Sequence, residues 1–225
     1  IDAFIRAKNY YREIYELQTV SIPIPIDPND LKNLHNVMDW AATAILMLAY
    51  KPRYGRRQFL CFGEELVRLG QSNILELAEK SMGFAEVNDD EIDSMRKQWL
   101  EMFRAAGKFH QGDWDCDRSV HPYKEQYYLD GFEALASSGN TRASLFLMEY
   151  TAAAAFNQII THAPPEEAEQ YVVQYTRWME ITGKGCSTDL SDCLERLSEL
   201  LQRVEYLIYE FAGENGISYD LTMKR

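Results

Sequence analysis

Cysteine is scarce in this sequence. The 225 residues contain four cysteines, Cys61, Cys116, Cys186 and Cys193, and no two of them have the CxxC spacing of zinc and redox motifs. A disulfide framework is therefore not indicated, and a reducing compartment, the cytoplasm, is the simpler location. The chain begins with Ile1 rather than Met, so an upstream segment can be missing from the sequence.

Long apolar runs, strand patterns and cofactor motifs are also lacking. The longest apolar run, WAATAILMLAY at 40–50, is too short to cross a bilayer and is typical of a buried core helix. No Asn-Gly or Asp-Gly turn separates two alternating apolar runs, so β-hairpins are not predicted. The fragment GKG at 183–185 is too small for a phosphate-binding loop, and no histidine follows a glutamate by three positions as in di-iron bundles. We expect neither a membrane span nor a cofactor.

Basic residues are outnumbered by acidic ones. The sequence holds 23 Lys and Arg against 35 Asp and Glu, which gives a formal net charge of −12. Such an excess repels a phosphate backbone, so general nucleic-acid binding is not expected. The same charge favours solubility and attracts a basic protein partner. With 46% apolar and 26% charged residues, the composition is that of a globular protein.

Helix signals dominate what is present. Asp27 and Pro28 supply an N-cap carboxylate and a proline at the first helical position. The sequence NDDE at 88–91 is typical of a capping-box start, and Gly70 is placed as a helix stop. These signals recur at short intervals. The chain is therefore predicted to form one all-α domain over residues 1–225, a compact bundle of about eight helices with short loops.

The last predicted helix carries the most regular apolar pattern. Its apolar residues step by fours and threes as in a heptad seam, at Leu190, Leu194, Leu197, Leu201, Val204, Ile208 and Phe211. Such a seam can pair with a second copy, which leaves a homodimer open. Leu200 and Leu207 widen the stripe beyond a two-stranded seam, however, and a wide stripe is typical of a bundle core. We therefore predict that the stripe is buried inside the protomer.

The segment HQGDWDCDRSVHPY, residues 110–123, crowds charged and aromatic side chains between two predicted helices. Asp113, Asp115 and Asp117 have the DxDxD spacing of a calcium loop. That template requires glycine at its sixth position and glutamate at its twelfth, where this chain has an arginine and a lysine. An EF-hand is therefore excluded.

A transition-metal site in this segment is the next alternative. His110, Asp115, Cys116 and His121 offer imidazole, carboxylate and thiolate, which all serve as metal ligands. Their spacing matches no closed zinc motif. We predict no tightly bound metal here and retain these four residues as the alternative.

A partner-facing surface is the interpretation that we favour for the segment. Asp113, Trp114, Asp115 and Asp117 combine negative charge with an aromatic side chain, and aromatic side chains dominate the energetics of interfaces. No basic run lies beside the three aspartates in the sequence, so their charges are expected to remain in solvent. There they would accelerate the encounter with a basic partner.

A catalytic pair is conceivable at the start of the same region. Arg104 and His110 have an R-x5-H spacing, which resembles the R-x4-6-H motif of helical HEPN-type ribonucleases. The resemblance implies an all-α fold and metal-independent cleavage of RNA with these two residues as catalytic groups. The motif is short and arises readily by chance.

Two functions from different classes follow from these observations. The first is a non-catalytic protein-binding module with an acidic surface, of the immunity or antitoxin type, which neutralises a basic toxin such as a nuclease. The absence of a complete catalytic motif, the net charge and the 14 tyrosines favour it. The second is an enzyme centred on residues 104–125, either a metal-assisted hydrolase or a HEPN-like ribonuclease.

Overall fold

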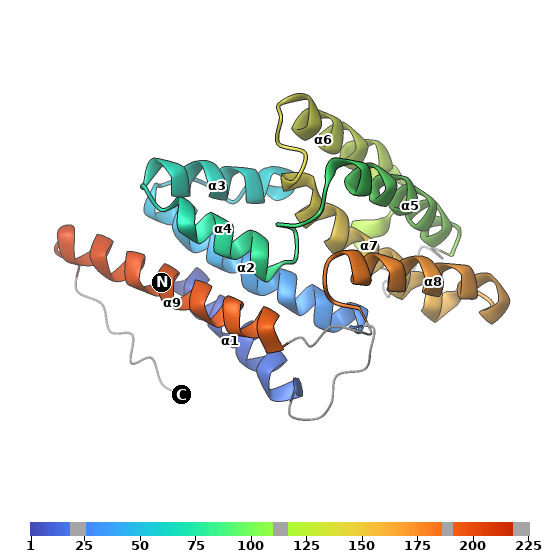
Figure 1. Ribbon diagram of the computed structural model, residues 1–225, viewed down its shortest axis with the longest axis horizontal. Coiled ribbons are helices and arrows are strands. Elements are labelled where there is room, and N and C mark those ends of the chain that lie inside the picture. Colours follow the sequence, from blue (N-terminus) through green and yellow to red (C-terminus); the bar gives the residue numbers. More distant parts are fainter. Residues whose placement is uncertain (19–25, 110–116, 186–190, 218–225) are drawn as a thin grey trace.

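The structure is a computed structural model that describes residues 1–18, 26–109, 117–185 and 191–217. In these residues the chain is all-α and contains no strand, which confirms the predicted fold class. Nine α-helices are described (Figure 1): α1 (Asp2–Gln18), α2 (Pro28–Leu48), α3 (Gln58–Arg68), α4 (Ser72–Ser81), α5 (Asp89–Lys108), α6 (Glu125–Ser137), α7 (Ala143–His162), α8 (Pro165–Ile181) and α9 (Ser191–Glu214). Three short 3-10 helices connect them: η1 (Gly55–Arg57), η2 (Arg118–Val120) and η3 (Pro122–Lys124).

The helix starts follow the predicted capping residues. The Asp27 carboxylate accepts a hydrogen bond of 2.8 Å from the backbone N–H of Asn29 at the start of α2. Asn88 and Glu91 form a reciprocal capping box before α5, with N–H to side-chain oxygen distances of 3.0 and 2.9 Å. Each of these bonds satisfies a backbone donor that has no partner within the helix. The local sequence therefore determines where α2 and α5 begin.

Two helices, α2 and α7, occupy the centre of the bundle. Helix α2 contacts α1, α3, α7 and α9, and α7 also contacts α5, α6 and α8. Figure 1 shows α1, α3, α4 and α9 gathered on one side of this central pair and α5, α6 and α8 on the other. Buried apolar residues form one connected cluster that reaches from α1 to α9. The contact between α2 and α7 therefore includes side chains that are fully buried, such as His35 and Glu149.

Residues 40–48 of the apolar run at 40–50 form the second half of α2, and the last two residues follow the helix. Residues 41–46 are all buried, as expected of a core helix, whereas Met47 and Tyr50 at its end are exposed. Among the helices that the structure describes, none combines the length and apolar character that crossing a bilayer requires.

Five of the seven predicted residues of the α9 stripe are buried inside the protomer, Phe211 is only partly buried, and Leu190 lies outside the described residues. Leu194, Leu197, Leu201, Val204 and Ile208 are all buried and pack in the common core, where α9 contacts α4, α2 and α1. The additional leucines that widen the stripe therefore meet several helices of the same chain. The stripe gives no support to a homodimer, which stays a prediction.

Candidate functional site

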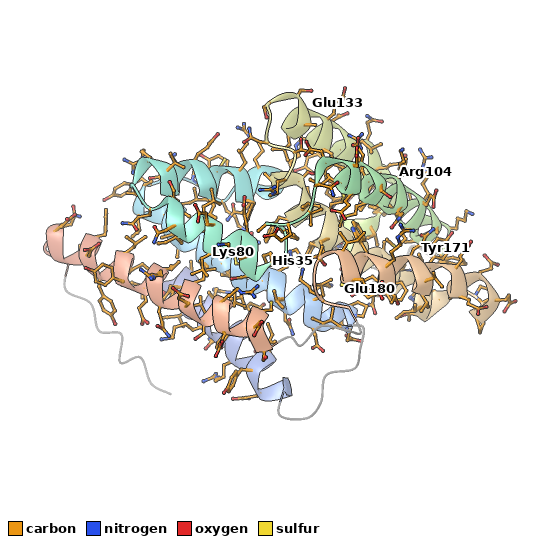
Figure 2. All side chains as sticks on the ribbon, in the orientation of Figure 1. His35, Lys80, Arg104, Glu133, Tyr171 and Glu180 are labelled. Atoms are coloured by element: carbon orange, nitrogen blue, oxygen red, sulfur yellow. The ribbon has the colours of Figure 1, made fainter. Side chains whose placement is uncertain are left out.

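Three ionisable side chains lie together inside the core. His35 comes from α2, Glu149 from α7 and Lys184 from the connection after α8, and their residues are only 1%, 0% and 2% exposed. Figure 2 places His35 near the middle of the molecule. Charged side chains are almost never buried to this degree unless they are paired. We call this group the buried polar centre.

The carboxylate of Glu149 joins the other two members of the buried polar centre. The Lys184 ammonium donates to Glu149 Oε1 over 2.9 Å and to the backbone carbonyl oxygen of Met82 over 2.6 Å. His35 Nε2 lies 2.8 Å from Glu149 Oε2. Burial by itself raises the pKa of Glu149, but the Lys184 ammonium and the His35 hydrogen bond outweigh it and lower the pKa to about 2. Glu149 is therefore ionised at neutral pH.

The ionised carboxylate determines the tautomer of His35. Because an ionised carboxylate can only accept, Nε2 must carry the hydrogen of the contact with Glu149. Burial lowers the pKa of His35 below its ordinary value, despite the raising effect of Glu149, so the ring is neutral. Nδ1 is then a lone-pair acceptor, and it is buried without a hydrogen-bond partner in the described part of the chain. A buried unpaired acceptor is uncommon in native structures.

A helix stop turns Lys184 towards the interior. The N–H groups of Gly183 and Lys184 donate to the carbonyls of Glu180 and Met179 over 3.1 and 2.6 Å, which is the pair of bonds of a Schellman motif. Gly183 has a positive φ of 66°, which a glycine adopts without strain. The residue after the glycine normally brings an apolar side chain back against the helix. Here that residue is a lysine.

The loop that receives Lys184 approaches α8 closely. Gly83, with a φ of 68°, lies so near the end of α8 that a Cβ atom on it would be 1.9 Å from the carbonyl oxygen of Thr182. Any larger residue would push this loop away from α8 and move the neighbouring Met82 carbonyl, which accepts from Lys184. Gly83 therefore positions the second partner of the lysine, the Met82 carbonyl.

A cavity of about 330 Å³ borders the buried polar centre, between α2, α7 and the loop that leads into η1. Its wall includes His35 itself, the aromatic rings of Phe146 and Tyr150, and the polar side chains of Asn36 and Asp39. The His35 ring centroid lies 4.8 Å from that of Phe146 and 6.0 Å from that of Tyr150. The cavity therefore combines an apolar wall with several polar groups, as ligand pockets do.

An ion pair lies at the solvent side of this cavity. Arg53 is exposed and hydrogen-bonds to the Asp39 carboxylate. Burial raises the pKa of Asp39, and Arg53 partly offsets that effect. The Arg53 guanidinium also lies 5.1 Å from the centroid of the Trp40 ring. These contacts hold the arginine at the opening and neutralise the carboxylate.

Asp117 is the only predicted partner-binding residue that falls within the described residues. Its carboxylate pairs with the Lys32 ammonium over 2.8 Å and accepts from the N–H of Ser119 over 2.8 Å as the cap of η2. Burial raises the pKa of Asp117, but these bonds outweigh it and lower the pKa. The expectation that all three aspartates keep their charges in solvent is wrong for Asp117. Asp113, Trp114 and Asp115 lie outside the described residues.

The predicted catalytic pair is described only in part. Arg104 projects from α5 and makes a two-nitrogen contact with the Glu125 carboxylate, with distances of 3.1 Å from Nε and 2.7 Å from Nη2. The helix ends at Lys108, between the two members of the motif. His110 lies outside the described residues. Arg104 thus already has a carboxylate partner.

The alternative metal site also falls mostly outside the described residues. His110, Asp115 and Cys116 are not described, and His121 uses Nδ1 to accept from the N–H of Tyr123 over 3.3 Å at the start of η3. Within residues 1–18, 26–109, 117–185 and 191–217, no group of three or more His, Cys, Asp or Glu side chains is arranged to hold a metal ion. His121 here has the role of a helix cap.

An acidic and tyrosine-rich face lies on the outer side of α9. The helix carries six acidic residues and two arginines, and its inner side is the buried apolar stripe. Glu195, Glu199, Tyr206 and Glu210 are exposed on the outer side, which we call the α9 outer face. The hydroxyl of Tyr206 hydrogen-bonds to Glu210, which raises the pKa of Tyr206. This face combines unburied aromatic surface with a surplus of negative charge.

Comparisons with known protein families, with curated proteins and with solved structures found no match to this chain.

Proposed function

We propose that this chain is a non-catalytic protein-binding module that recognises a basic protein through its acidic surface. In its specific form the proposal is a cytoplasmic immunity or antitoxin protein that neutralises a basic toxin such as a nuclease. The net charge of −12 would attract such a partner over a distance of several ångströms.

The α9 outer face is the observation that carries this proposal. Interfaces are stabilised by aromatic side chains at their centres and oriented by complementary charge. Tyr206 is 60% exposed and lies among glutamates, so both components occur on one helix side. The opposite side of the same helix is fixed in the core, which makes the outer face a rigid surface for a partner.

The 113–117 region is the second surface in the proposal. Asp113, Trp114 and Asp115 would add charge and an aromatic anchor to the contact. Asp117 would serve differently, because its carboxylate is engaged with Lys32 and caps η2. We therefore assign Asp117 to holding the end of this segment in place rather than to meeting the partner directly.

The enzyme alternative, centred on residues 104–125, has less support. A catalytic arginine must contact the phosphate of the substrate, and Arg104 would first have to give up the Glu125 carboxylate. Analysis of the purified protein for bound metal and an assay for RNA cleavage test this alternative directly.

A pull-down from the native host tests the binding proposal. The bait is the full chain, and the matched bait carries Glu195→Gln, Glu199→Gln and Glu210→Gln on the α9 outer face. We expect a basic protein that is retained by the unmodified bait and depleted on the variant. Capture of acidic proteins only, or equal capture of a basic protein by both baits, would contradict the role of this face.

A further inference from the structure

The cavity beside the buried polar centre is lined by a histidine that has one ring nitrogen without a hydrogen-bond partner in the described part of the chain. His35 is 1% exposed and lines the cavity. Its Nε2 is engaged with Glu149, which leaves Nδ1 as the nitrogen that can serve a guest. Because the contact with Glu149 keeps the hydrogen on Nε2, Nδ1 can only accept a hydrogen bond and cannot donate one. The guest must therefore carry an N–H or O–H group.

Two more polar groups of the cavity wall are available. The Asn36 amide and the Tyr150 hydroxyl make no hydrogen bond with any other described residue, and both line the same cavity. Asn36 follows His35 on α2, and Tyr150 follows Glu149 on α7. The two central helices of the bundle thus each present a polar group beside the acceptor. The arrangement can orient a guest as well as hold it.

The charges around the cavity are balanced in pairs. Arg53 neutralises Asp39 at the opening, and Asp117 neutralises Lys32, whose ammonium lies 6.0 Å from the centroid of the Tyr150 ring. A cationic guest would compete with Arg53 or Lys32, and an anionic guest would face Asp39 and Asp117. A neutral guest leaves both ion pairs intact. The charge balance therefore favours a neutral ligand.

We propose that this cavity binds a neutral aromatic ring that carries an N–H or O–H donor, with the donor on Nδ1 of His35. The volume of about 330 Å³ is at the lower end of the range for ligand pockets and suits one or two fused rings. Phe146 and Tyr150 provide aromatic surfaces for such a ring. This inference concerns a different surface from the α9 outer face and does not rest on the proposed function.

Two sources offer this chemistry, a free small molecule and a tryptophan or tyrosine side chain of another protein. Indole represents the free ring, and N-acetyl-tryptophanamide represents the same ring attached to a backbone. Binding of indole alone assigns the cavity to free ligands, whereas binding of both shows that the opening also admits a side chain. Both results support the proposal.

Matched ligands provide the decisive experiment on the unmodified full chain. Indole is compared with 1-methylindole, and phenol with toluene, by calorimetric titration, with the imidazole nitrogens of ¹⁵N-labelled histidine followed by NMR. We expect the member with the donor to bind about tenfold more tightly, the factor for one hydrogen bond, and to shift the Nδ1 resonance of His35. Equal affinity within each pair, or no binding of indole and phenol at millimolar concentration, would overturn the proposal.

Two variants test whether the difference in affinity within each ligand pair arises at His35. His35→Phe retains an aromatic ring but removes the acceptor, and we expect it to abolish the difference within each ligand pair. His162→Gln changes an exposed histidine at the end of α7 and should leave the difference intact. If His35→Phe fails to fold, the ligand pairs on the unmodified chain still decide the question. A preserved difference in folded His35→Phe would show that the donor binds elsewhere.

Discussion

Glu149 and Glu199 each accept a hydrogen bond from a cationic side chain at a similar distance, yet their surroundings are opposite. The Lys184 ammonium lies 2.9 Å from Glu149, and the Arg203 guanidinium lies 3.1 Å from Glu199. Neither partner of the first pair is more than 1% exposed in its side chain, whereas both partners of the second are about half exposed, at 53% and 51%. The two contact distances are nearly the same, so the difference in solvent exposure determines how much each ion pair affects stability and whether it can meet a partner.

Removing one member of the buried pair strongly lowers the free energy of unfolding, because it leaves an uncompensated charge in the core. The exposed pair is screened by water and salt and adds little to folding. Its charge remains available to a partner for the same reason. Breaking the buried polar centre is therefore expected to destabilise the fold, and the α9 outer face is the better candidate for recognition.

The largest effect is expected for Glu149→Gln. This change removes the charge that Lys184 and His35 face, and it should lower the free energy of unfolding by about 3–5 kcal/mol. The matched change Glu199→Gln on α9 should cost less than about 1 kcal/mol. Urea denaturation of the two variants measures the difference. Similar losses in both would mean that burial does not separate the two carboxylates.

Replacement of the whole buried polar centre should restore much of that loss. In the triple variant His35→Phe, Glu149→Leu and Lys184→Met, no charged side chain remains in the buried polar centre, and only the Met82 carbonyl loses a donor. Buried ionic groups can often be exchanged for apolar residues of similar volume without loss of stability. We expect an unfolding midpoint in urea clearly above that of Glu149→Gln. A triple variant as unstable as the single one would show that the packing of these residues, and not their charge, is responsible.

Acidification should weaken the buried polar centre in two steps. The pKa of His35 is lowered in the folded chain by burial, so the unfolded chain binds more protons and stability is lost as the pH falls below about 6.5. The pKa of Glu149 is lowered to about 2, and its contribution is lost as the pH falls from about 4.5 towards 2. One such group changes the stability by at most about 1.4 kcal/mol per pH unit.

The first step can be assigned with two histidine variants. Urea midpoints are measured between pH 7.5 and 5.5 for the unmodified chain, His35→Phe and His162→Gln. The decline should be reduced in His35→Phe and retained in His162→Gln. If the urea midpoint of His35→Phe falls with pH as steeply as that of the unmodified chain, the loss of stability belongs to other groups.

The smallest effect on stability is expected on the α9 outer face. Changing Glu195, Glu199 and Glu210 together to glutamine should alter the free energy of unfolding by less than about 0.5 kcal/mol per residue, because exposed positions contribute little to folding. The same variant should associate more slowly with the basic partner, and the difference should shrink as salt is added. Stopped-flow or surface-binding kinetics at several salt concentrations measure it. Association rates that are equal at low salt would remove this face from the interface.

Local sequence determined the helices of this protein and which of their sides are apolar. The Asp27 and Asn88 caps, the stop at Gly70 and the wide stripe of α9 each involve residues within a few positions of one another, so their patterns can be read along the chain. Short-range hydrogen bonds and helical periodicity require no knowledge of the other helices. The all-α class followed from them.

Tertiary structure alone decided which polar side chains meet. His35, Glu149 and Lys184 are separated by 114 and 35 positions, and no spacing rule relates them. The helix stop at Gly183 directs Lys184 towards the interior, but the groups that it meets there depend on the packing of α8 against the loop at Gly83. Likewise, Asp117 was expected in solvent because its partner, Lys32, lies 85 positions away. Long-range pairs are selected by the packing of whole helices, and that packing depends on the complete core.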